Sequence, residues 1–183
     1  TYTCTIRDAN ACVLTRTVTI TQPVALTVGI TSTSLTCNGV CSGAAAASPA
    51  GGTAPYTYLW NNASTKATIT GLCAGSFSVT VRDANGCTGT QTVTIVQPTA
   101  LTGTPSQTNT TCNNVCDGTA SVLAGGGTMP YTYRWNPGAQ TTSSVTGLCD
   151  GTYTFSLTDA NSCLVTNSVT ITEPVVLSAN PSA

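Results

Sequence analysis

The residues of this chain that could do chemistry are its ten cysteines, and histidine is absent. Zinc sites usually combine C-x2-C pairs with further cysteine or histidine ligands. Here a C-x3-C pair is followed by single cysteines, a spacing that disfavours a metal site. The pattern predicts disulfides formed in an oxidising, extracellular compartment. We therefore expect no metal and no cofactor.

Groups that could act as general acids or bases are scarce. The chain has one lysine and no histidine, which removes most of the usual proton-transfer groups. Asp8, Asp83 and Asp159 recur in the same Asp-Ala-Asn-x-Cys context, which indicates a structural turn. One carboxylate per turn is too few for a dedicated calcium site. We expect a protein that is not an enzyme.

Charged residues make up 6% of the chain, with five basic and six acidic side chains. No basic stripe exists, so we expect no nucleic-acid partner. No apolar run approaches the length of a membrane span, so we expect no membrane insertion. The chain does not begin with Met or with a secretion signal, which predicts a segment of a longer product.

Self-similarity is the strongest pattern in the sequence. Residues 27–101 align with residues 102–177 over almost their whole length. Cys37 and Cys112 are 75 positions apart, and Cys87 and Cys163 are 76 positions apart. A proline follows the last cysteine of each repeat at the same distance, and these prolines are Pro23, Pro98 and Pro174.

This period predicts four parts. They are the last hairpin of a repeat (1–22), two complete repeats (23–98 and 99–174) and the start of another repeat (175–183). Partial repeats cannot bury a core alone, so we expect a longer array or ends completed by neighbouring chains. The three prolines, without a Gly/Ser-rich spacer, predict stiff junctions and a head-to-tail rod. Each repeat would add roughly 30–40 Å to its length.

Alternation of apolar and polar residues predicts strands throughout, as in residues 76–82, and no segment has helical spacing. Six or seven short strands per repeat indicate an all-β, immunoglobulin-like sandwich. A small sandwich needs its large side chains inside. The aromatic residues expected in the core are Tyr56, Tyr58, Trp60, Phe77, Tyr131, Tyr133, Trp135 and Tyr153. The alternative is a sugar-stacking stripe, which would expose Tyr56 or Tyr131.

The Asp-Ala-Asn-x segment joins two strands by a tight turn. Asn tolerates the left-handed backbone conformation better than most residues. The position after Asn is Ala11, Gly86 or Ser162. We therefore expect the left-handed residue to be the Asn.

Two disulfides follow from the expected strand order. Cys41 would begin the second strand and Cys73 would precede the sixth, at the same end of the sandwich. We therefore expect Cys41–Cys73 and Cys116–Cys149 bonds. Each would contribute roughly 3–4 kcal/mol in the chain-entropy model.

The remaining motif cysteines allow two arrangements. Cys37 and Cys87 lie at opposite ends of one sandwich, beyond the roughly 7 Å that a disulfide spans. This favours an inter-repeat Cys37–Cys163 bond, with Cys12 and Cys87 pairing upstream and Cys112 downstream. The alternative is Cys37–Cys87 with Cys112–Cys163.

Cys4 does not belong to these motifs. It aligns with Val79 and Phe155, which are expected to face inward. We expect Cys4 to be a buried, inert free thiol.

The motifs GG-x2-PYTY-x-W, GL-x-x-G-x-[YF], DAN-x-C and [QE]P, taken together, resemble the SprB-type repeat of Bacteroidota gliding adhesins. The resemblance covers nearly the whole chain, and polycystic-kidney-disease-type domains are more distantly similar. It implies type 9 secretion, long surface filaments built from repeats, and a role in gliding motility or adhesion. The additional pair Cys41 and Cys73 departs from the usual pattern of the family and suggests a stiffer variant.

We expect a structural repeat segment of a secreted cell-surface adhesin or filament. Its partners would be adjacent repeats or copies of itself, and surface polysaccharide or the substratum. The alternatives are a subunit of a non-covalent polymer assembled by strand complementation and a glycan-binding repeat.

Overall fold

A computed structural model describes residues 1–176, so part of the expected fourth segment, residues 177–183, lies outside the described residues. All regular structure in the described part is β-strand, which confirms the all-β class. The first two strands, β1 (Tyr2–Arg7) and β2 (Val13–Val18), form an antiparallel hairpin. No helix within residues 1–176 has the length and apolar character needed to cross a membrane.

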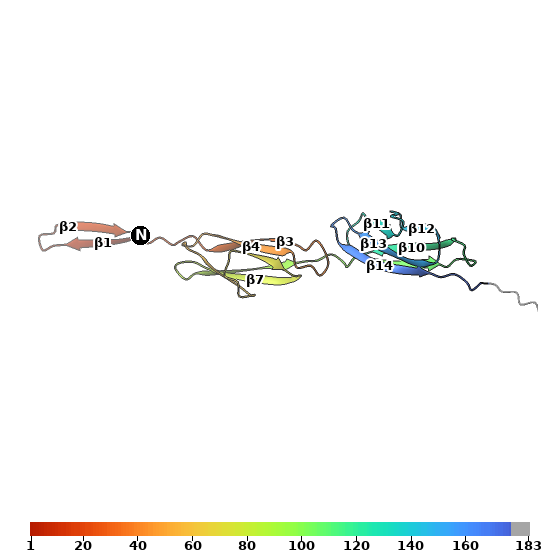
Figure 1. The fold of residues 1–183 in the computed structure, drawn as a ribbon. Helices are drawn as coiled ribbons and strands as arrows, with labels where there is room; N and C mark the ends of the chain where they lie inside the picture. Colours follow the sequence, from red (N-terminus) through yellow and green to blue (C-terminus); the bar gives the residue numbers. More distant parts are fainter. Residues whose placement is uncertain (177–183) are drawn as a thin grey trace, which may run out of the picture. The chain divides into compact units, whose positions relative to one another are not determined.

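The second complete repeat contains six strands in two three-stranded sheets (Figure 1). One sheet has the order β12-β10-β9 and the other has the order β11-β13-β14. In immunoglobulin lettering, with strand D absent from this repeat, these are E-B-A and C-F-G, the strand order of an immunoglobulin-like sandwich. The strands are β9 (Thr102–Thr108), β10 (Gly118–Gly125), β11 (Thr132–Asn136), β12 (Ser144–Leu148), β13 (Gly151–Thr158) and β14 (Leu164–Ile171).

Side chains from both sheets of this repeat form one core. Val122 and Val145 come from the first sheet, and Trp135, Phe155 and Ile171 come from the second. They alternate along their strands with residues that are more exposed, because successive residues of a strand face opposite sides. The two sheets therefore pack as a sandwich, as expected.

The first complete repeat has the same strand order, with sheets β3-β4-β6 and β5-β7-β8. Its strands are β3 (Thr27–Thr33), β4 (Gly43–Ala50), β5 (Thr57–Trp60), β6 (Thr68–Leu72), β7 (Gly75–Arg82) and β8 (Thr88–Ile95). Buried side chains again come from both sheets: Ala45, Ala47 and Ile69 from one, and Trp60, Val79, Val81 and Ile95 from the other. The two repeats are thus built alike.

The aromatic stripe lies against the core. Trp60 and Trp135 are each 1% exposed. Their indole N–H groups donate to the carbonyl oxygens of Lys66 and Thr142 at 2.8 and 3.0 Å. Tyr56, Tyr58, Phe77, Tyr131, Tyr133 and Tyr153 are half-buried. On the opposite face of the same strands, Leu59 and Arg134 are exposed, as a one-sided strand requires.

The expectation of a buried Cys4 is wrong, because the structure exposes this side chain. Cys4 pairs with Arg16 across the β1–β2 hairpin, and all residues of both strands are exposed. Its counterparts Val79 and Phe155 are buried because a second sheet covers them. Among residues 1–176, no such sheet is paired with or packed on the hairpin.

By its internal contacts the chain divides into two compact units. One unit combines Thr1–Thr31, Ala45–Ile69 and Phe77–Val93. The other combines Ser32–Ala44 and Thr70–Ser76 with the chain from Thr94 onward. Two segments of the first repeat, each a loop with the adjoining strand ends, therefore pack in the same unit as the second repeat.

Candidate functional site

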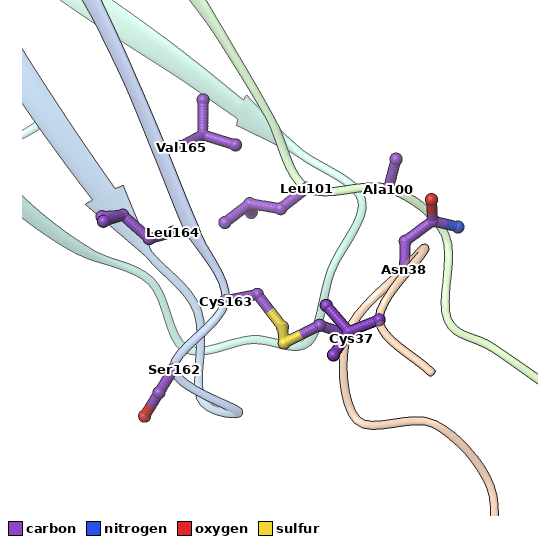
Figure 2. A pocket seen from close by; sticks show the side chains of 9 residues that line it. Cys37, Asn38, Ala100, Leu101, Ser162, Cys163, Leu164 and Val165 are labelled. Carbon is purple, nitrogen blue, oxygen red and sulfur yellow. A yellow bond between two sulfur atoms is a disulfide. The ribbon is translucent and has the colours of Figure 1, made fainter. Parts of the chain in front are cut away.

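A disulfide between Cys37 and Cys163 joins the first complete repeat to the second. The two Cα atoms lie 5.6 Å apart, although the residues are separated by 126 positions in the sequence. This is the inter-repeat pair favoured by the sequence, and the alternative pairs Cys37–Cys87 and Cys112–Cys163 are not formed. Figure 2 shows the bond, with Leu101, Leu164 and Val165 gathered on one side of it.

One hydrogen bond between repeats accompanies the disulfide. The side-chain amide of Asn161 donates to the carbonyl oxygen of Thr36 at 3.1 Å. The same amide donates to the hydroxyl of Thr128 at 3.0 Å, within its own repeat. Beside the bond lies a pocket of about 310 Å³, lined mainly by apolar side chains such as Val40 and Leu101. The two repeats are thus joined by a covalent bond and a hydrogen bond, beside a pocket with a mainly apolar lining.

The loop that presents Cys37 is held by the end of its own repeat. Gly39 has a φ of 74°, a left-handed conformation that glycine adopts without steric cost. Its N–H donates to the side-chain oxygen of Gln97 at 3.0 Å. The side chain of Asn38 donates to the carbonyl oxygen of Pro98 at 2.9 Å. The Gln-Pro dipeptide therefore fixes the loop from Cys37 to Cys41.

Sequence reasoning assigned a junction role to the prolines and missed the side chain before each of them. The sequence pattern that could have indicated their role is that each proline follows a residue with an amide or carboxylate side chain, namely Gln22, Gln97 and Glu173. Such side chains can accept hydrogen bonds from backbone N–H groups. In the described structure Pro23 and Pro174 are exposed and Pro98 is half-buried. Whether these prolines stiffen the junctions stays a prediction.

The turn that presents Cys163 is built around Asp159, which is buried. One carboxylate oxygen accepts from the N–H groups of Asn161 and Cys163, each at 2.9 Å. The other accepts from the N–H of Thr128 at 2.9 Å. Asp83 makes the same bonds in the first repeat, to Asn85, Cys87 and Thr53. The recurring aspartate therefore organises a turn.

These contacts determine the acidity of both carboxyl groups. Burial raises the pKa of Asp83. Hydrogen bonds from the backbone N–H groups of Thr53, Cys87, Asn85 and Gly86 lower it by more, so the pKa lies below its ordinary value. The pKa of Asp159 is lowered in the same balance of burial against backbone N–H donors. Both groups thus favour the charged form that the turn requires.

The left-handed residue of this turn follows the Asn, so the expectation that the Asn itself is left-handed is wrong. Ala11, Gly86 and Ser162 have φ values of 66°, 88° and 66°. In each turn the N–H of this residue donates to the carbonyl oxygen of the Asp. The geometry is that of a type I turn followed by a left-handed residue, a common three-residue hairpin. Asn occupies position i+2, the second of the two central residues of the type I turn, and this position needs no positive φ.

Two further disulfides lie within the repeats. Cys41 is joined to Cys73 and Cys116 to Cys149, with Cα atoms 4.0 and 3.9 Å apart. These are the pairs expected from the strand order. Each connects the loop before the second strand of its repeat to the loop before the fifth, which lie at one end of the sandwich. In immunoglobulin lettering this later strand is F, the position expected for it, and it is fifth in its repeat because strand D is absent between residues 23 and 174.

Four cysteines of the described chain are unpaired and exposed: Cys4, Cys12, Cys87 and Cys112. Three of them occupy motif positions. Cys12 and Cys87 correspond to Cys163, and Cys112 corresponds to Cys37. Residues 1–176 contain no group of three or more Cys, Asp or Glu side chains placed to hold a metal ion. The chemistry that the arrangement supports is covalent joining of repeats.

The fold and this junction define a class: tandem immunoglobulin-like sandwich repeats with disulfides within and between them. The family model described as the SprB repeat matches residues 29–65 and 104–140, one segment in each complete repeat. These two segments confirm the resemblance to the SprB-type repeat. The family is non-catalytic and typical of cell-surface adhesins. No curated protein matches the chain.

Two solved structures have low overall similarity to this chain. A C-terminal 282-residue fragment of intimin, in complex with the intimin-binding domain of the translocated intimin receptor, is 16% identical with a TM-score of 0.36. The match covers 93% of this chain and 56% of the intimin fragment, so the chain spans little more than half its length. The amphioxus IgVJ-C2 molecule is 16% identical with a TM-score of 0.28, over 66% of this chain and 90% of that one.

Proposed function

We propose that this chain is a structural repeat segment of a long, secreted cell-surface adhesin or extracellular filament. Its repeats provide stiff, disulfide-stabilised reach for attachment or gliding. The observation that carries the proposal is the Cys37–Cys163 bond, which joins two consecutive repeats covalently. A bond of this kind restricts movement between repeats, as a rod-like array requires.

The family match and the cysteines support an extracellular location. The matched segments are repeats of a surface-adhesin type, and disulfides form and persist in oxidising compartments. The family resemblance adds secretion by the type 9 system and a source among the Bacteroidota to the proposal. The partners in this proposal are adjacent repeats in the same filament, with polysaccharide or the substratum at the point of attachment.

One observation favours a second candidate, a polymer subunit completed by strand addition. The β1–β2 hairpin exposes Tyr2, Ile6 and Val18, which are 65%, 60% and 59% exposed. Strands of another chain could cover such an apolar face by completing the sandwich. The glycan-binding candidate has less support. Tyr56 and Tyr131 are half-buried, and their hydroxyls donate to the carbonyl oxygens of Gly51 and Gly126.

Intact cells that produce the protein provide the test. An antibody raised against the repeats should label their surface and lose its signal after brief external proteolysis. On a denaturing gel without reductant, the boiled protein should migrate as a chain far larger than 18.4 kDa. Reductant should leave it large, because the repeats belong to one polypeptide. A band near that mass after boiling without reductant would support the non-covalent polymer, and a purely intracellular signal would overturn both candidates.

A further inference from the structure

Cys112 is exposed and unpaired, although its counterpart Cys37 is bonded to the following repeat. The surface around Cys112 comprises the loop Cys112–Cys116 and the preceding residue Thr111. We call it the acceptor loop. Three observations show that this loop has the conformation of its engaged counterpart, residues 36–41.

The first observation is the shared backbone geometry. The N–H of Val115 donates to the carbonyl oxygen of Cys112 at 3.3 Å, as Val40 does to Cys37 at 3.4 Å. The third residue of each loop is left-handed, with φ values of 59° at Asn114 and 74° at Gly39. The acceptor loop therefore holds a backbone conformation unusual for a non-glycine residue.

The second observation is that equivalent junction dipeptides, Gln97-Pro98 and Glu173-Pro174, fix the two loops. The carboxylate of Glu173 accepts from the side chain of Asn113 at 2.7 Å and from the N–H of Asn114 at 2.8 Å. Gln97 serves the first loop in the same way, through Gly39. The acceptor loop has an additional brace, because Asp117 accepts hydrogen bonds from both the N–H and the hydroxyl of Thr111.

The third observation concerns the turns that would enter such a loop. The turns at Cys12 and Cys87 have the conformation of the engaged turn at Cys163. In each, the Asp carboxylate accepts from the N–H of the cysteine, at 2.8, 2.8 and 2.9 Å. Asn85 donates to Thr53 as Asn161 does to Thr128. An amide nitrogen carries two N–H donors, so Asn85 retains one that matches the bond from Asn161 to Thr36.

From these observations we propose that the acceptor loop at Cys112 is a docking surface for the Asp-Ala-Asn-x-Cys turn of a further repeat of the same type. Docking places the two thiols together. Their oxidation forms one S–S bond, releasing two protons and two electrons to an oxidising thiol–disulfide couple such as glutathione disulfide. The inference rests on the proposed function, in that the docked turn belongs to the next repeat of an array.

The proposal has a mechanical consequence. An inter-repeat bond closes a loop of 126 positions, whereas equivalent cysteines recur every 75 or 76 positions. Loops closed at successive junctions therefore overlap along the chain. Tension applied to the array would pass from one inter-repeat disulfide to the next through the short chain segments that join them. The parts of the sandwiches that lie inside the closed loops would not carry this tension. Such an array would gain little length under load.

The purified 183-residue chain provides the test, because it carries both halves of the junction unpaired. The reduced protein is reoxidised at high concentration in a glutathione buffer, and disulfide-linked peptides are mapped. Cys112 should pair between copies with Cys12 or Cys87. These links should outnumber Cys112–Cys112 and Cys112–Cys4 links by roughly fivefold, as expected if one additional hydrogen bond favours docking. Cys112→Ser should abolish the multimers, and Cys4→Ser should not.

Cys4 is the internal control, since it is exposed but lies outside the motif. Pairing of Cys112 with Cys4 or with itself as often as with the motif turns would overturn the proposal. So would a Cys112 thiol that stays unlinked while Cys37–Cys163 re-forms. Either result would leave the surface-labelling test of the adhesin proposal unaffected, so the two can fail separately.

Discussion

The Cα atoms of Cys37 and Cys163 lie 5.6 Å apart, although the residues are 126 positions apart in the sequence, and the segment between them includes most of both complete repeats. The bond therefore closes a large loop that contains the two smaller disulfide loops, of 32 and 33 positions. Only β3 of the first repeat and β14 of the second lie outside this loop. A force applied to the two ends of the chain can thus extend little of either sandwich.

Removal of this bond should lengthen the unfolded chain. When single molecules are pulled from both termini, Cys163→Ser should add about 200 Å of contour length. This estimate takes the large loop, less the two that stay closed, at about 3.3–3.6 Å per residue. Cys4→Ser is the matched control and should leave the contour length unchanged. Equal lengths for Cys163→Ser and the wild type would show that the bond does not restrain the chain.

Acid should weaken the turns through Asp83 and Asp159. Their pKa values are lowered in the folded state, so they stabilise the fold above the unfolded-state value of about 3.9. This contribution is lost as the pH falls through the lower folded-state values. With disulfides intact, the melting temperature should therefore fall between pH 5 and pH 2, about the range over which such a carboxylate titrates.

The double variant Asp83→Asn, Asp159→Asn should be less stable at pH 7 and should show a smaller drop in acid. An amide can replace only one of the two accepting oxygens, because its NH2 group donates. Asp150→Asn removes one carboxylate at an exposed side chain and should leave the melting temperature at pH 7 near that of the wild type. An unchanged acid transition in the double variant would contradict the role of these carboxylates.

Among single side chains of the second repeat, truncation of Trp135 should lower the free energy of unfolding the most. It is 1% exposed, its ring lies 5.5 Å from that of Phe155, and its N–H is bonded to Thr142. Trp135→Ala should lower the free energy of unfolding by about 3–5 kcal/mol, measured by denaturant titration. Arg134→Ala, on the exposed face of the same strand, should change it by less than about 0.5 kcal/mol. Similar costs for the two variants would place Trp135 outside the core.

Gln97 should favour formation of the Cys37–Cys163 disulfide, although its side chain bonds to Gly39 and not to either cysteine. Its side chain holds Gly39 in the loop that presents Cys37. Gln97→Ala removes one hydrogen bond worth about 1 kcal/mol, so the equilibrium constant for forming Cys37–Cys163 in a redox buffer should fall roughly fivefold. Gln91→Ala is the control, because its side chain accepts only from the adjacent Thr92 among the described hydrogen bonds. A fivefold loss in both variants would assign the effect to general destabilisation.

Features that depend on local pattern could be predicted from the sequence. Alternation along residues 76–82 predicted a strand, and the structure has β7 there with Val79 and Val81 inside. The repeat period, the six or seven strands expected per repeat and the aromatic stripe follow from the same kind of pattern. Strand order then brings Cys41 near Cys73, because it determines which loops share an end of the sandwich.

Contacts between distant segments were decided only by the tertiary structure. Cys4 has the pattern of a core residue but is exposed, since burial depends on a second sheet and no local pattern specifies one. The choice between Cys87 and Cys163 as partner of Cys37 depends on which loops meet across 126 positions. The bonds from Gln97 to Gly39 and from Asn161 to Thr36 likewise needed the packed structure. Local periodicity thus determined the strands, and packing determined which of their ends became joined.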